Sequence, residues 1–270
     1  EYNPDWIPPP GATVEDLCRT KGSNSRRTIV DHLGPEQAKM LFDGELVIDS
    51  ILASFLANAV GLSAAFWLER DKLYRAALIR RQSEQQLLGQ LPLDEMRARL
   101  FIPSVHSHAE IVAEVAHFFG KDDPESCREH IEQLPTLVKQ KTSRALISNP
   151  GSLAVWIRAG ELEADRIECA DWSPKQLQEL LPEFRKLTRT EDPRKYLSKL
   201  DSLCKTCGIA FVVLRALSGC RARGVVRFLS PNKVMLLVSY RHLTDDQFWF
   251  SFFPNISMNL LTNCIVTLEN

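Results

Sequence analysis

The chain has 270 residues, of which 44% are hydrophobic and 25% are charged, and its formal net charge is −1. This balance excludes a global attraction to nucleic acid or to a membrane surface, so a DNA-binding site would have to be local. Seven cysteines without a regular spacing indicate free thiols in a reducing compartment. The acidic first residues are unlike a signal peptide, and no apolar run approaches the roughly 18 residues of a membrane span. We expect a cytoplasmic protein without a membrane role.

The N-terminal quarter predicts a compact set of short helices. They are expected over residues 14–21, 25–33, 36–42 and 51–60, each followed closely by a glycine. Pro35 stands at the start of the third helix, where its missing N–H is not needed. A short helix, a tight turn and a second short helix form the layout of a helix-turn-helix, whose second helix enters the major groove of DNA.

Four side chains of this region are candidates for DNA contact: Arg26, Arg27, Gln37 and Lys39. Glutamine can read adenine edges, and lysine or arginine can reach guanine or phosphate. Acidic residues are at least as numerous as basic ones over the first ninety residues. Because phosphate neutralisation supplies most non-specific affinity, we expect a monomer to bind weakly and a homodimer to bind paired half-sites of an operator.

The middle of the chain predicts further helices, over residues 70–91, 92–102, 109–119, 125–141 with a break at Pro135, and 153–164. It contains no glycine-rich phosphate loop and no nucleophile elbow. His106 and His108 are not accompanied by cysteines or carboxylates at the spacing of a metal site.

The last third of the chain predicts strands as well as helices. Helices are expected over residues 175–188 and 194–205, and strands over 209–214, 224–229 and 234–239, the last two forming a hairpin. The lone Cys204-x-x-Cys207 pair has no second pair for zinc. An aromatic helix after Thr244 should pack on the sheet and break at Pro254. The expected fold is mainly α with a small α+β C-terminal domain, divided into residues 1–80, a helical connector 81–172, and 173–270.

Several segments resemble the HigA-type branch of the XRE (lambda-repressor-like) regulators. The matching residues are Pro9-Pro10-Gly11, Gly61 to Leu68 with Phe66-Trp67, Tyr74, Phe118-Phe119-Gly120, and 154–161. The resemblance implies an N-terminal helix-turn-helix that binds operator DNA as a dimer, and a cognate toxin or regulator protein as a partner.

The C-terminal segment resembles an ImmA/IrrE-type metallopeptidase domain through residues 208–213, 217–219, 245–253 and 260–261. In that family the aromatic run continues into H-E-x-x-H, whose histidines bind zinc and whose glutamate is the general base. In this chain the positions of the first histidine, the glutamate and the second histidine hold Pro254, Asn255 and Met258. None of these residues can bind zinc or act as the general base in their place. The resemblance therefore implies a degenerate peptidase motif, with no metal, no cofactor and no catalysis.

Three functional interpretations follow. The first is a DNA-binding transcriptional regulator, of antitoxin type, with a non-catalytic sensor or interaction domain. The second is a protein-interaction module that does not bind DNA. The third, which the replaced ligands disfavour, is a zinc metallopeptidase.

Overall fold

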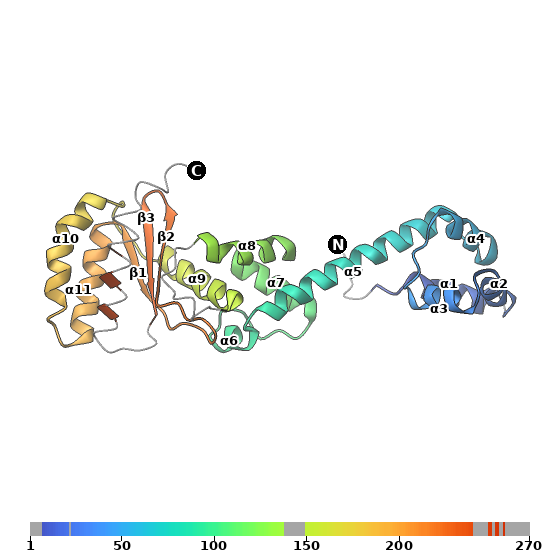
Figure 1. The fold of residues 1–270 in the computed structure, drawn as a ribbon, viewed down its shortest axis with the longest axis horizontal. Coiled ribbons are helices and arrows are strands. Elements are labelled where there is room, and N and C mark those ends of the chain that lie inside the picture. The colour runs from blue at the N-terminus through green and yellow to red at the C-terminus, as the bar shows by residue number, and fades with distance from the viewer. Residues whose placement is uncertain are drawn as a thin grey trace. The chain divides into compact units, whose positions relative to one another are not determined.

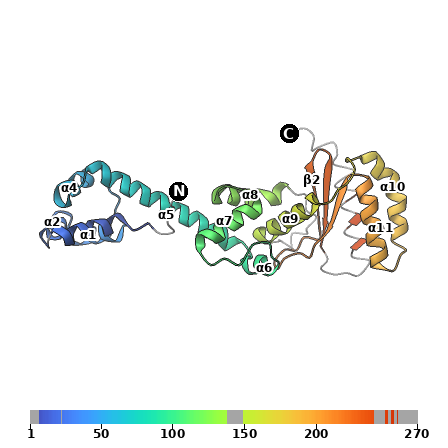
Figure 2. The ribbon, with the colours of Figure 1, turned by 180° about the vertical axis from the view of Figure 1, so that it is seen from behind.

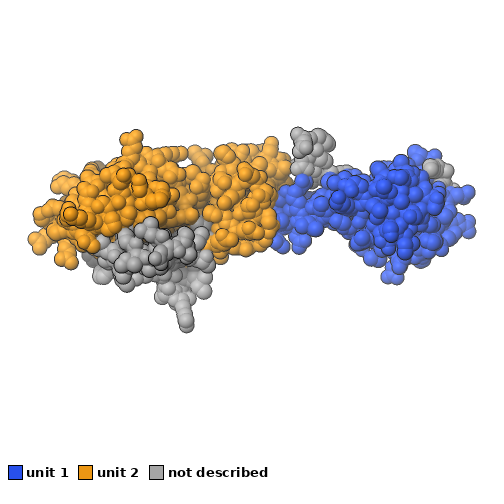
Figure 3. Space-filling model, turned by 90° about the horizontal axis from the view of Figure 1, so that it is seen from above, with its two compact units in different colours: residues 1–86 blue, residues 87–270 orange. Residues whose placement is uncertain are grey.

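A computed structural model describes residues 7–21, 23–137 and 149–239, together with Phe248, Trp249, Phe252, Phe253 and Ile256. The chain divides into two compact units, residues 1–86 and residues 87–270, which Figure 3 colours separately. Unit 1 has one hydrophobic core and unit 2 has two, and the units are described in turn.

Unit 1 is built from α1 (Pro10–Lys21), α2 (Ser23–Leu33), α3 (Pro35–Asp43), α4 (Ser50–Val60) and the first part of α5 (Ala64–Gln90). Gly34, with φ of 79°, makes the tight turn between α2 and α3, and Gly44 ends α3 in the left-handed conformation. Asp49 caps α4 by accepting a 2.8 Å hydrogen bond from the Leu52 N–H. The core takes one face from each helix and includes Val14, Ile29, Ala38, Leu41, Leu56 and Trp67.

The first turns of α5 are fixed to the rest of unit 1. The buried Trp67 indole donates from Nε1 to the Gly61 carbonyl at 3.0 Å. Arg70 donates to the Pro8 carbonyl at 2.6 Å, and Arg75 donates to the Leu46 carbonyl at 2.8 Å. The helix begins at Ala64, six residues earlier than the 70–91 helix predicted from the sequence, and the segment around Phe66-Trp67 is therefore its first turn.

Unit 2 combines six helices with three strands among its described residues. The helices are α6 (Leu93–Ala98), α7 (His108–Phe119), α8 (Pro124–Leu137), α9 (Pro150–Asp165), α10 (Pro174–Leu187) and α11 (Pro193–Thr206); the strands are β1 (Ile209–Val213), β2 (Gly224–Ser230) and β3 (Lys233–Val238). The sheet order is β1-β3-β2. β1 runs parallel to β3, and β2 forms the expected antiparallel hairpin with it.

The sheet separates two cores, because successive side chains of a strand point to opposite faces. Met235 and Leu237 of β3 pack with α9, whereas Val234 and Leu236 pack with α10 and α11. Figures 1 and 2 show α9 on one side of the sheet and α10 and α11 on the other. The second core also holds the described aromatic residues Phe248, Trp249, Phe252 and Phe253. The expected packing of the aromatic run on the sheet therefore holds for these residues.

A buried ion-pair cluster joins three elements of unit 2. Glu161 of α9, only 7% exposed, lies 2.5 Å from Arg227 of β2 and 3.2 Å from Arg158. Arg158 also donates from Nε to the Phe118 carbonyl at the end of α7, at 2.8 Å. The cluster links α7, α9 and the edge strand β2.

The predicted fold class, mainly α with a small α+β part, is confirmed. Within the described ranges no single helix is both long and apolar enough to cross a membrane, although α4 and α5, bent by 119°, meet that test when taken together.

Candidate functional site

The four predicted DNA-facing residues all lie on the surface of unit 1. Gln37 and Lys39 are exposed on α3, whose buried positions are Ala38 and Leu41. Residues two apart on a helix do not share a face, so Gln37 and Lys39 project in different directions. Glu36 lies on the same side of α3 as Lys39. Asp43, four residues after Lys39, is exposed on this side as well, so this face of α3 carries one positive and two negative charges.

Arg26 and Arg27 are engaged in weak contacts within unit 1. Arg26 lies 3.6 Å from a Glu15 carboxylate oxygen, and its guanidinium lies 5.0 Å from the centre of the Phe42 ring. Arg27 lies 3.7 Å from an Asp31 oxygen. The two arginine side chains are still 60% and 83% exposed. Exposed ion pairs of this kind contribute about 0–1 kcal/mol, so both arginines remain available to a phosphate.

The residues of the degenerate peptidase motif, Pro254, Asn255 and Met258, lie outside the described residues, and so does the helix break expected at Pro254. The aromatic residues before them form a structural cluster. Phe248 and Trp249 lie 5.6 Å and 5.2 Å from the Tyr196 ring, measured between ring centres, and Phe252 lies 6.1 Å from Phe211. These distances are typical of aromatic packing in a core.

The Cys204-x-x-Cys207 pair is also embedded in a core. Both thiols are buried at the end of α11, and burial raises the pKa of Cys207 to about 11 and that of Cys204 well above its usual value. Thiols in this state are poor nucleophiles and poor metal ligands. Among the residues that the structure describes, no group of three His, Cys, Asp or Glu side chains is placed to hold a metal ion.

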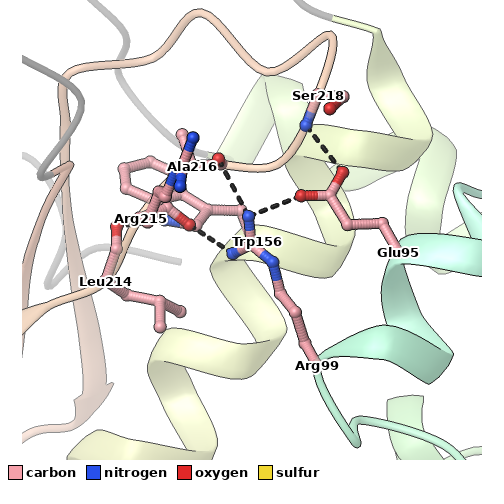
Figure 4. Close-up of polar contacts among 7 residues, drawn as sticks. All are labelled: Glu95, Arg99, Trp156, Leu214, Arg215, Ala216 and Ser218. Atoms are coloured by element: carbon pink, nitrogen blue, oxygen red, sulfur yellow. Dashed lines mark hydrogen bonds and ion pairs between the residues drawn. The ribbon is translucent and has the colours of Figure 1, made fainter.

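A polar pocket of about 500 Å³, which the sequence did not indicate, lies in unit 2. It is bounded by α6 and by the loop that follows β1, residues 214–218. Figure 4 shows how α6 holds this loop. Glu95 accepts a 2.8 Å hydrogen bond from the Ser218 backbone N–H, and Arg99 donates to the Arg215 carbonyl at 2.5 Å and to the Ala216 carbonyl at 3.2 Å.

Glu95 of α6 and Arg99, the residue that directly follows α6, also form an ion pair with each other at 2.5 Å. Burial alone would raise the pKa of Glu95, but the hydrogen bond from Ser218 and the charge of Arg99 outweigh it, and the pKa lies below its usual value. Glu95 is therefore a carboxylate at neutral pH. The pair cancels its own charge while fixing the wall of the pocket.

The far side of the same loop is fixed by α9. Trp156, fully buried, donates from Nε1 to the Leu214 carbonyl at 2.9 Å (Figure 4). The Gly219 carbonyl accepts a 3.0 Å hydrogen bond from the Asn149 N–H. The loop is thus held from both sides and offers a pre-formed surface.

Comparison with known proteins identifies no relative: no family model, no curated protein and no solved structure matches this chain. The functional assignment therefore rests on the residues and their geometry.

Proposed function

We propose that unit 1 binds double-stranded operator DNA as part of a homodimeric transcriptional regulator, and that unit 2 is a non-catalytic interaction domain. The supporting observation is the α2–turn–α3 arrangement. A nine-residue helix follows a glycine turn directly, buries Ala38 and Leu41, and leaves Gln37 and Lys39 exposed. A helix presented in this way fits the major groove. The sequence resemblance to XRE regulators supports the same proposal.

The experiment measures binding of the full chain to a labelled duplex from the region upstream of its own gene, by fluorescence anisotropy over a range of salt concentrations. Each lost phosphate contact reduces the slope of log K against log salt by about 0.9. The variant Arg26→Ala/Arg27→Ala/Lys39→Ala should bind more weakly and with a smaller slope. A matched control, Arg19→Ala/Lys72→Ala/Arg81→Ala, removes the same charge from other exposed positions of unit 1 and should bind like the wild type.

Absence of binding at low salt would contradict the proposal and would leave unit 1 as a protein-interaction module. Binding that survives the triple change would contradict the residue assignment. Gln37→Ala adds a test of sequence readout, because a lost base contact should reduce discrimination at one base pair by about 1–3 kcal/mol.

The dimer is supported by exposed apolar side chains on α5. Phe66 is 38% exposed and Leu73 is 52% exposed, and residues seven apart lie on one face of a helix. If this face joins two copies, Phe66→Glu/Leu73→Glu should be monomeric by light scattering after gel filtration. The control Leu68→Glu/Ile79→Glu alters two exposed residues on another face of the same helix and should leave the dimer intact.

The non-catalytic assignment of unit 2 rests on the replaced ligands at Pro254, Asn255 and Met258. Metal analysis of the purified protein tests it. We expect no stoichiometric zinc, whereas one zinc per chain that is removed by a chelator would favour a metallopeptidase instead.

A further inference from the structure

The pocket between α6 and the loop after β1 has a surplus of positive charge. Arg99 is neutralised by Glu95, but Arg215, which also lines the pocket, is exposed and has no side-chain hydrogen bond or ion pair within the described part of the chain. The residues that line the pocket include one carboxylate, Glu95, and two arginines, so the lining carries one net positive charge. The pocket therefore favours an anionic ligand.

The loop that lines the pocket is held in place, which favours binding of an anionic ligand further. The Arg215 backbone is held by Arg99, and the neighbouring residues of the loop are held by Glu95 and Trp156. A ligand that binds here does not have to order the loop, so little entropy is lost on binding.

The residue that follows the pocket-lining Arg99 in the chain is exposed, although it is not itself among the residues that line the pocket. Leu100 follows Arg99 directly and is 88% exposed, the highest value among the exposed large hydrophobic side chains described. Its φ of 59° places it in the left-handed region, which is uncommon for residues other than glycine. The hydrogen bond from the Phe101 N–H to the Met96 carbonyl, at 2.9 Å, closes the end of α6 around it, a position that glycine usually occupies.

Leucine at this position is unfavourable for the fold in two ways. The left-handed backbone costs about 1–2 kcal/mol relative to a helical conformation, and the side chain gains no burial in return. Strained positions of this kind are concentrated at functional sites. An apolar contact with a ligand would make use of the exposed side chain.

From these observations we propose that the pocket binds an acidic segment of a partner protein, in which a carboxylate pairs with Arg215 and an adjacent apolar side chain packs on Leu100. Arginine binds carboxylates through two parallel hydrogen bonds, which sets the orientation of the segment. This inference specifies the partner chemistry of unit 2 and rests on its proposed role as an interaction domain.

The experiment selects a phage-displayed library of random twelve-residue peptides on the full-length protein, with counter-selection on Arg215→Glu. We expect enriched peptides that carry Asp or Glu next to Leu, Ile or Phe. For a synthetic peptide of that type, Arg215→Glu should weaken binding at least tenfold. Arg189→Glu, at an exposed arginine beyond the end of α10, should leave binding unchanged.

Leu100→Gly separates a binding role from a structural one. The glycine variant should be as stable as the wild type or more so, and yet bind the peptide several-fold more weakly. Enrichment of peptides without acidic residues, equal binding to Arg215→Glu, or unchanged peptide affinity in Leu100→Gly would overturn the proposal. A duplex oligonucleotide that binds the wild type but not Arg215→Glu would also overturn it, in favour of nucleic acid. These readouts use unit 2 variants and a peptide, so they are independent of the DNA-binding test on unit 1.

Discussion

The contact between α9 and the end of α5 leaves no room for a side chain at Gly151. A Cβ at this position would lie 1.9 Å from the Gln90 carbonyl oxygen and 2.8 Å from its carbonyl carbon, whereas ordinary contacts begin at 3.4 Å. Both of the atoms it would meet belong to the backbone, so rotation of a side chain cannot relieve the clash. Gly151→Ala therefore requires α9 and residue 90 to separate by more than 1 Å.

The expected loss is large because α9 cannot move freely. Nearly every residue from Gly151 to Ala164 is buried between the sheet and other helices. Overpacking a core typically costs about 1–3 kcal/mol, and a clash between two backbones should reach the upper end of that range or exceed it. We expect Gly151→Ala to lower the free energy of unfolding by about 3 kcal/mol or more.

Two other glycines provide a graded comparison with the same substitution. At Gly160 the new Cβ would lie 2.7 Å from Leu237 Cδ2, the end of a side chain that can shift, and we expect a loss of about 1–2 kcal/mol. At Gly89, in α5, a Cβ would have no neighbour within 4 Å. Gly89→Ala should stabilise the protein by about 0.5–1 kcal/mol, because alanine favours the helix.

Urea denaturation followed by far-UV circular dichroism measures all three variants. The expected order of midpoints is Gly89→Ala above wild type, then Gly160→Ala, then Gly151→Ala, with similar m-values. A Gly151→Ala protein within about 0.5 kcal/mol of the wild type, or more stable than Gly160→Ala, would refute the reasoning.

Three further predictions concern unit 2. Trp156→Phe leaves the Leu214 carbonyl without its buried donor and should lower the free energy of unfolding by about 1–3 kcal/mol in urea. The pKa of Glu95 is lowered in the folded protein from 4.5, so its ionised form stabilises the protein above that pH, and this stabilisation is lost as the pH falls through the folded pKa. The difference in unfolding free energy between wild type and Glu95→Gln should therefore be larger at pH 7 than at pH 3. An equal difference at the two pH values would contradict the contact with Ser218. Burial and raised pKa values should keep Cys204 and Cys207 unreactive towards Ellman's reagent at pH 8 until urea is added, and rapid labelling of both thiols in the folded protein would be inconsistent with their placement.

Local patterns were sufficient to predict most elements of the fold. Gly34 and Gly44 lie at the limits of α3, as their position in the sequence indicated, and Asp49 caps α4. Two apolar runs separated by a turn predicted the β2–β3 hairpin, which the structure contains. The four candidate DNA contacts proved to be exposed. The ion pair between Arg27 and Asp31 follows from their i, i+4 spacing in α2, whereas the pair between Arg26 and Glu15 depends on how α1 and α2 pack, which the sequence does not show.

The pocket could not be predicted because its contacts join distant parts of the chain. Glu95 and Ser218 are 123 residues apart, and Arg99 and Arg215 are 116 residues apart. In the sequence, Glu95 and Arg99 form an ordinary i, i+4 pair on a short surface helix. Leu100 likewise gave no signal, because a left-handed conformation at a leucine follows from the closure of α6 and not from the residue type.

The position of β3 has a consequence for folding during synthesis. β3 is the central strand, yet it is the last of the three to be translated, and its side chains supply both cores of unit 2. β1 and β2 do not pair with each other, so the sheet and the two cores that pack on it cannot form before residue 238 has left the ribosome. Until then the nascent chain exposes the apolar faces of α9, α10 and α11 together, and such intermediates are prone to aggregation. We expect the folding of unit 2 during synthesis to depend on chaperones more strongly than the folding of unit 1 does. The helices of unit 1 form their core from segments that are close in the sequence.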